Sequence, residues 1–147
     1  CIGKNVEHHP EIYHRIIEEG HSVGNHTHNH LNGWKTENLD YYRNIKAASK
    51  HIQTRLFRPP YGRITPAQSY GVSRLFPKAR IIMWDVLSGD FDTTLSPEQC
   101  LQNVVHATRA GSIIVFHDSE KAWERLQFAL PNFLAYCQDR GWKMKKL

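Results

Sequence analysis

The chain has 147 residues, 40% of them hydrophobic, and a net charge of +5, so its length suits one domain with a substantial core rather than two. Charged residues make up 22% of the sequence and no low-complexity run or internal repeat is present, which excludes a disordered or fibrous protein. No apolar stretch is long enough to span a membrane, and the scattered Lys and Arg residues accompany no nucleic-acid recognition motif, so we expect neither a membrane span nor a nucleic-acid partner.

In the first part of the chain, helical and extended patterns alternate. The range Pro10–Glu19 has isoleucines at helical spacing and ends before Gly20, a frequent helix stop. Ser22–Asn25 is a candidate for a short buried strand. Thr36 is expected to cap a long helix, and residues 56–57 form a brief extended piece before two prolines. The predicted apolar stripe of the long helix consists of Leu39, Tyr42, Ile45, Ala48 and Ile52.

Two helix starts in the second half are marked by capping residues. Thr65 and Ser96 each precede a proline and are followed three residues later by a glutamine, which is the pattern of a capping box. A last helix runs from Trp123 to near Gly141, and Pro131 is expected to kink or split it. These helices separate the extended segments of this half.

Apolar runs in the second half predict strands that are covered on both faces. Ile81–Trp84 and Ile113–Phe116 are uninterrupted, as in parallel sheets, and Trp142–Leu147 is a candidate for a final strand. Strand and helix thus alternate from end to end, which indicates parallel strands joined by helical crossovers. The fold class is therefore α/β, either an open sheet or a barrel that needs more strands to close. Functional residues are expected at the carboxyl ends of the strands.

Reactive residue types follow the predicted strands. They are His26 and His30 after the first strand, Arg58, Pro60 and Tyr61 after the second, Asp85, Asp90 and Asp92 after the third, and His117 with Asp118 after the fourth. A single His or Asp near a strand end is usually a cap or a loop residue. Several of them aligned in one topology are better explained by a functional site.

His26 and His30 are spaced by four residues, so they can share one face of a helical turn and bind one divalent ion. Taken alone, this spacing more often marks a histidine-rich surface loop, since His21 and His28 lie in the same stretch; His28 is expected to point elsewhere. A zinc peptidase of the HExxH type is disfavoured, because Thr27 stands in place of the glutamate. A catalytic metal also needs a third ligand, commonly a carboxylate.

The residues after the other strands suit polar chemistry. The prolines after Arg58 stiffen a turn whose Tyr61 and Gly62 N–H groups can face a substrate as an oxyanion site, although an arginine salt bridge beside a proline turn is an equal alternative. Asp90 is either a turn residue or a carboxylate that orients His117, as a general acid requires. His117 lies at the open end of a predicted buried strand, a position that packing explains poorly.

The motif segments together resemble the polysaccharide deacetylase family, the carbohydrate esterases with a NodB-like domain. They are HTHNH at 26–30, FRPPYG at 57–62, WDVLSGDFD at 84–92 and IIVFHDS at 113–119. The resemblance covers nearly the whole chain and implies a deformed (β/α) barrel in one NodB-like domain over residues 1–147. The family's first motif, a TFDDG-like segment with the catalytic-base and metal-ligand aspartates, belongs upstream of Cys1, so we expect the chain to lack the first strand region.

The resemblance also implies roles for the residues at the strand ends. Hydrolysis of N- or O-acetyl groups on a sugar polymer would use a divalent metal ion, most often zinc, with His26 and His30 as ligands. The implied catalytic residues are His117 as the acid for the leaving group, Asp90 as its partner, Arg58 as the residue that positions the base, and Tyr61, whose N–H stabilises the oxyanion. We expect substrate contacts from Pro60, Tyr61 and Phe91.

The expected partner is an acetylated polysaccharide or oligosaccharide, such as chitin oligomers, peptidoglycan or acetylxylan. A cell-envelope or secreted location is favoured over a cytoplasmic one. Because the two aspartates of the first motif are missing, the fragment is expected to be inactive by itself. The alternative interpretation is a non-catalytic carbohydrate-binding relative that keeps the groove and lacks the base.

Overall fold

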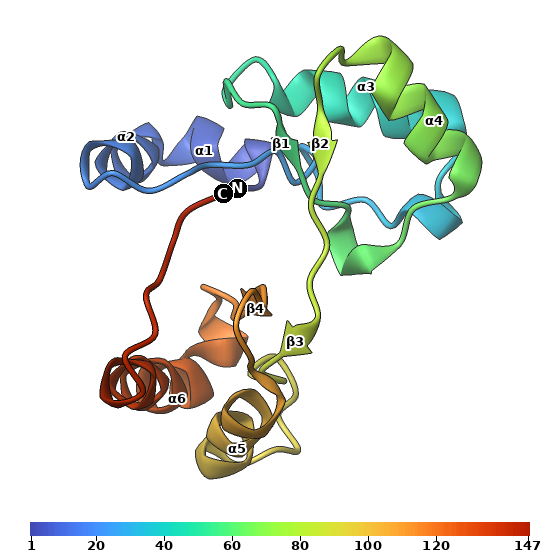
Figure 1. The fold of residues 1–147 in the computed structure, drawn as a ribbon. Helices are drawn as coiled ribbons and strands as arrows, with labels where there is room; N and C mark the ends of the chain where they lie inside the picture. The colour runs from blue at the N-terminus through green and yellow to red at the C-terminus, as the bar shows by residue number, and fades with distance from the viewer. The chain divides into compact units, whose positions relative to one another are not determined.

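Short parallel strands connected by helices build residues 1–147 in the computed structural model (Figure 1). The chain divides into unit 1, residues 1–83 with 146–147, and unit 2, residues 84–145. Each unit mixes helices with one parallel strand pair, which is the α/β organisation that the sequence predicts. The barrel and the single domain stay predictions. None of the helices is both long and apolar enough to cross a membrane.

Unit 1 contains α-helices, two short 3-10 helices and one strand pair. In chain order its elements are α1 (Gly3–His8), α2 (Pro10–Glu18), η1 (Gly33–Lys35), α3 (Asn38–Ala48), β1 (Leu56–Phe57), η2 (Pro60–Gly62), α4 (Pro66–Leu75) and β2 (Arg80–Ile81). The α2 helix is confirmed, and Thr65 forms the predicted capping box with Gln68 at the start of α4. The sequence pattern misses α1, because Val6 is the only apolar side chain that its six residues bury.

A parallel pairing of β1 with β2 is extended by one further contact. The predicted strand Ser22–Asn25 is reduced to a single bridge between Asn25 and Phe57. The Asn25 N–H donates to the carbonyl of Leu56 at 2.8 Å, and the Arg58 N–H donates to the carbonyl of Asn25 at 3.0 Å. The segment after Asn25 therefore lies beside the segment after β1. In the β1–β2 register, Leu56 is opposite Arg80 and Phe57 is opposite Ile81.

The helix predicted to start at Thr36 is α3, which begins at Asn38 without a side-chain cap. The Thr36 hydroxyl instead donates to the carbonyl of Asn32 at 2.7 Å. Leu39 is 59% exposed, so the predicted stripe is wrong at its start, and Ile52 is buried but lies beyond the helix. The buried residues of α3 are Tyr41, Ile45 and Ala48.

The core of unit 1 consists of two clusters, and α3 contributes to both. One cluster contains Val6, Tyr13, Ala48 and Ile52, and the other contains Tyr41, Ile45, Phe57 and Val72. The α3 helix packs against α1 and also lies beside α4 (Figure 1). It is therefore the central support for the loops that carry His26 and Arg58.

Unit 2 has the same construction on a smaller scale. Its elements are β3 (Val86–Leu87), α5 (Pro97–Ala107), β4 (Ile114–Val115) and α6 (Glu120–Asp139). Ser96 forms the predicted capping box with Gln99 at the start of α5. The strands pair in parallel, with Val86 opposite Ile114 and Leu87 opposite Val115.

Other predicted features of the second half differ from the structure. The apolar run Ile81–Trp84 is not one strand, because the chain leaves β2 after Ile81 and Met83 is 41% exposed. The α6 helix continues through Pro131, so the predicted split is absent, and packing against α5 offsets the one backbone hydrogen bond that proline cannot donate. The predicted kink stays a prediction. Trp142–Leu147 forms no strand, because none of its residues enters a ladder.

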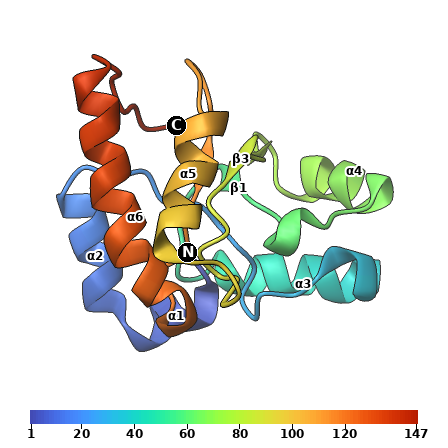
Figure 2. The same ribbon diagram turned by 90° about the horizontal axis from the view of Figure 1, so that it is seen from below.

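Replacing Phe133 by alanine is expected to lower the free energy of unfolding by about 3–5 kcal/mol. Helices α5 and α6 pack side by side (Figure 2), and Phe133 is 2% exposed in their shared core with Val86, Val104 and Cys137. Urea unfolding measures the change. Phe128→Ala is the matched control, because Phe128 is 36% exposed on the same helix. An equal loss in both variants would contradict this core.

Candidate functional site

The HTHNH loop follows the Asn25 bridge and brings His26 and His30 together. Their ring centroids are 4.9 Å apart in an edge-on arrangement. The loop is not the helical turn that the spacing allows, because Thr27 and His30 adopt left-handed backbone conformations, with φ of +61° and +56°. Thr27 is fully buried, and its hydroxyl accepts the N–H of Leu31 at 3.1 Å. The surrounding contacts thus hold a strained turn, a feature that clusters at functional sites.

Arg58 holds His26 in one tautomer. The Nδ1–H of His26 donates to the carbonyl of Arg58 at 2.6 Å, and because a carbonyl only accepts, the ring proton lies on Nδ1. Burial lowers the pKa of His26 to about 4, although the bond to Arg58 raises it in part. The ring is therefore neutral at neutral pH and keeps a lone pair on Nε2, which is what a metal ligand requires. The pair fits a divalent ion.

The metal-free protein is expected to lose stability as the pH falls from about 6.5 to about 4. The pKa of His26 is about 4 in the folded chain and about 6.5 in an unfolded one, so within this window the unfolded state binds the additional proton. The loss is on the order of 2–3 kcal/mol. Urea unfolding with a chelator at about pH 7 and about pH 4.5 measures it. His26→Ala should show a smaller change; an equal change would refute the assignment.

The proline turn of FRPPYG presents Tyr61 to His30. Pro59 and Pro60 are fully buried, whereas Tyr61 is 60% exposed and has a φ of +58°. The ring centroids of Tyr61 and His30 lie 4.6 Å apart. The Gly62 N–H donates to the carbonyl of Pro59 at 3.0 Å, so the prediction that this N–H is free is wrong. Tyr61 is thus an exposed residue of the turn whose ring contacts that of His30.

Asp90 and His117 form a close pair in unit 2. Asp90 Oδ1 accepts the Nδ1–H of His117 and Oδ2 accepts its backbone N–H, both at 2.7 Å. Asp90 is fully buried, while the side chain of His117 is 40% exposed. The ring of Phe91 lies 5.2 Å from that of His117, centroid to centroid. The two bonds fix the imidazole and leave its Nε2 free of the carboxylate, which is the arrangement that a general acid needs.

Asp90 is ionised despite its burial. Burial raises its pKa, but hydrogen bonds from the ring and the backbone of His117 more than offset this effect, so the pKa lies below its ordinary value. The Nε of Arg125 donates to the carbonyl of Asp90 at 2.7 Å, and Arg125 is itself only 4% exposed. Arg125 is not among the residues that the sequence motifs mark. The available signal was an arginine on the face of α6 that also carries Ala122 and Ala129.

The neighbouring acids are hydrogen-bonded to residues other than His117. Asp85 accepts the N–H of Ile113 at 2.7 Å and the hydroxyl of Ser112 at 2.9 Å, and these bonds lower its pKa. Asp92 accepts the hydroxyl of Thr94 at 2.7 Å. Neither carboxylate contacts His117 in the way that Asp90 does, so Asp90 is the acid to which a chemical role is assigned.

The predicted site residues fall into two groups. His26, His30, Arg58, Pro60 and Tyr61 belong to unit 1, and Asp90, Phe91 and His117 belong to unit 2. Within unit 1 the structure assembles two imidazoles beside an exposed tyrosine. Within unit 2 it assembles an imidazole with an ionised carboxylate. The first group can hold a metal ion and the second can transfer a proton.

The family model of polysaccharide deacetylases matches residues 1–75, just over half of the chain, including the HTHNH and FRPPYG segments. The chain belongs to the polysaccharide deacetylase family. A peptidoglycan-N-acetylglucosamine deacetylase of Bacillus cereus is 35% identical over 126 residues, which cover 80% of this chain and 44% of that protein. Chitin deacetylase 2 of Saccharomyces cerevisiae is 30% identical over 131 residues, which cover 80% of this chain and 41% of that protein.

A solved structure of a peptidoglycan N-acetylglucosamine deacetylase shares the fold of this polysaccharide deacetylase chain. The TM-score is 0.88 at 26% identity, and the match covers 99% of this chain and 70% of the other. The mixed α/β fold is therefore that of a known deacetylase. The chain spans less than half the length of the two curated relatives, 44% and 41%.

Proposed function

We propose that the natural protein containing residues 1–147 is a metal-dependent deacetylase of N-acetylglucosamine polymers such as peptidoglycan or chitin oligomers. The observation that carries this proposal is the pair of His26 and His30, in which His26 is neutral and keeps Nε2 unprotonated. The relatives named as peptidoglycan and chitin deacetylases support the substrate class. A cell-envelope or secreted location suits such polymers.

In this proposal His26 and His30 hold a divalent ion, zinc first among the candidates. Imidazole nitrogen is a preferred ligand of zinc, and the Arg58 carbonyl orients His26 as outer partners of ligating histidines do. A bound ion would polarise the acetyl carbonyl as a Lewis acid. Residues 1–147 contain no TFDDG-like segment, so the proposal requires a third ligand and a catalytic base from outside this range.

The pair of Asp90 and His117 supplies the proton in this proposal. The Asp90 carboxylate holds the Nδ1–H of His117, so that Nε2 of the ring carries the proton to the departing amine. The N–H of Tyr61 is assigned to the oxyanion, which fits the exposed turn that this residue occupies. Arg58 is assigned to the position of the base. Sugar contacts are assigned to Tyr61 and Phe91, which are 60% and 39% exposed, whereas the fully buried Pro60 is assigned to support of the turn.

The test uses the zinc-loaded natural protein with acetylated chito-oligosaccharides, peptidoglycan and acetylxylan. Release of acetate from the two N-acetylglucosamine polymers, lost in the His26→Ala variant, is the expected result. No acetate above that of the His26→Ala variant on any substrate would overturn the proposal. Retention of the polymers without acetate release would show a carbohydrate-binding protein instead.

A further inference from the structure

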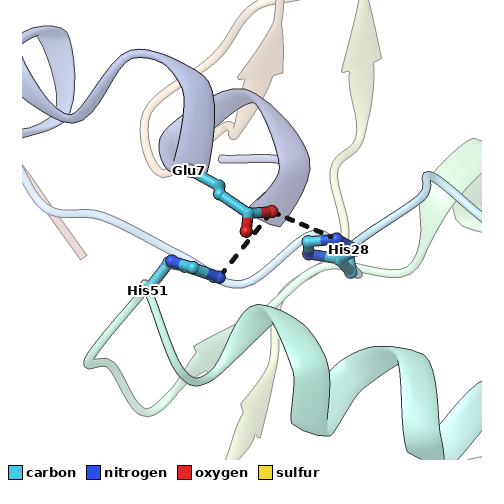
Figure 3. A group of neighbouring side chains, drawn as sticks. All are labelled: Glu7, His28 and His51. Atoms are coloured by element: carbon cyan, nitrogen blue, oxygen red, sulfur yellow. Dashed lines mark ion pairs between the residues drawn. The ribbon is translucent and has the colours of Figure 1, made fainter.

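Glu7, His28 and His51 converge in unit 1, and none of them belongs to the pair of His26 and His30. Figure 3 shows Glu7 on α1, His28 in the HTHNH loop and His51 just after α3, with both imidazoles turned toward the carboxylate. Glu7 Oε2 lies 3.6 Å from Nε2 of His28 and 4.0 Å from Nε2 of His51. The ligand atoms of the three side chains all lie within 4.8 Å of one another.

We propose that Glu7, His28 and His51 form a second metal site, which binds zinc or a similar divalent transition-metal ion. Two imidazoles and one carboxylate are a ligand set that suits zinc. Ligand atoms about 2.1 Å from a tetrahedral zinc ion lie about 3.4 Å from one another. The separations of 3.6 Å and 4.0 Å from Glu7 Oε2, and the spread of all three atoms over 4.8 Å, exceed this value, so side-chain rotations are needed to bring the three atoms to bonding distance. The Glu7 side chain is half exposed, so in this proposal water supplies the fourth ligand.

The site is partly organised before any ion binds. Asn44 Oδ1 accepts the N–H groups of both His28 and Asn29, at 2.8 Å and 2.9 Å, which fixes the loop backbone beneath the imidazole. Gly3 allows α1 to approach, because a Cβ at that position would lie 2.8 Å from Nδ1 of His28. The rings of His28 and His51 stack with centroids 5.9 Å apart. Two imidazoles converge on one carboxylate oxygen, which is more than a simple surface ion pair between one histidine and one glutamate requires.

The environment of His28 sets the expected affinity. Its Nδ1 is buried and has no hydrogen-bond partner. Ligation through Nε2 leaves the ring proton on Nδ1, and a buried N–H without an acceptor weakens binding by about tenfold or more. The Glu7 side chain is 49% exposed, against 20% for His28 and 28% for His51, so one edge of the site is open to solvent. We therefore expect weaker binding than in a closed structural zinc site.

A metal ion at this position would join three separate parts of unit 1. Glu7 belongs to α1, His51 follows α3, and His28 lies between His26 and His30 in the sequence. The ion would thus anchor the loop that carries the proposed catalytic ligands. Binding of this ion does not depend on deacetylase activity, so the proposal of a second metal site and the proposed function can fail independently.

The experiment counts zinc ions in a chain whose first site has been removed. In the His26→Ala, His30→Ala double variant, calorimetric titration with Zn²⁺ is expected to show one bound equivalent. Adding His51→Gln or Glu7→Gln should weaken that binding by about tenfold or more, since a ligand matters at least as much as an outer-shell group. His8→Gln is the matched control, because His8 is an exposed histidine of α1 outside the group, and it should leave the affinity unchanged.

Circular dichroism of each variant shows that it is folded, and Glu7→Gln, an exposed substitution, serves if His51→Gln does not fold. Absorption of bound Co²⁺ provides a second measurement, which should show imidazole ligation in the double variant and lose it with His51→Gln. The proposal is overturned if the folded double variant binds no zinc. It is equally overturned if Glu7→Gln and His8→Gln bind zinc with the same affinity.

Discussion

Zinc affinity of the natural protein is expected to fall by about 100-fold or more when His30 is replaced by alanine. Loss of an outer-shell partner of a ligating histidine typically costs about 10- to 100-fold, and a ligand itself contributes more. Acetate release should fall with zinc occupancy, because an ion held by His26 and His30 would supply the Lewis acid for the acetyl carbonyl. Competition with a chelator measures the affinity, and acetate release at limiting zinc measures the activity.

The affinity is best measured in a Glu7→Gln background, where binding of zinc to the proposed second site is weakened. His21→Ala is the matched control, since His21 is an exposed histidine of the same stretch that neither proposed site uses. It should bind zinc as the background protein does. Unchanged affinity in His30→Ala would exclude His30 as a ligand, even though its ring lies 4.9 Å from that of His26.

Local signals in the sequence predict the helix starts better than the buried faces. The capping boxes at Thr65 and Ser96 are present as predicted, because each depends only on residues within one turn. The stripe of α3 depends on a neighbour that the sequence does not show. That neighbour is α4: the Tyr42 hydroxyl donates to the carbonyl of Ala67 at 2.9 Å. The fully buried tyrosine of α3 is Tyr41, which the predicted stripe does not contain.

The motifs likewise predict those features of the site that depend on local sequence, and they do not predict those that depend on long-range contacts. The spacing of HTHNH identifies His26 and His30, but the bond from His26 to the carbonyl of Arg58 depends on the bridge between Asn25 and Phe57, a contact across 32 residues. The Glu7, His28 and His51 group is assembled from three distant segments, so no sequence spacing marks it. Long-range contacts therefore determine the tautomer of His26 and assemble the Glu7, His28 and His51 group. Residue type and order in the sequence indicate only the metal-binding and proton-transfer chemistry.

Replacing His117 by alanine in the natural protein is expected to reduce kcat by about 10²- to 10⁴-fold, the range for removal of a general acid. The fold should persist, because the side chain of His117 is 40% exposed. Asp90→Asn should also reduce kcat. Asp90 now accepts hydrogen bonds from two N–H groups of His117, and the amide NH₂ group of asparagine would face one of them, so that two donors would oppose each other. This variant should in addition lose about 1–3 kcal/mol of unfolding free energy, because it leaves a buried polar group unpaired.

The two variants separate catalysis from folding when kcat and urea unfolding are measured together. A low kcat in a His117→Ala variant that remains folded assigns the chemistry to the imidazole, although loss of the ring N–H takes one hydrogen bond from the buried Asp90 and lowers stability as well. Asp90→Asn should lower both quantities, because Asp90 is a positioning residue. Asp92→Asn is the control in the same loop, since Asp92 accepts only from Thr94, and it should keep wild-type kcat. If folded His117→Ala keeps wild-type kcat, the pair of Asp90 and His117 stabilises unit 2 and the proton has another source.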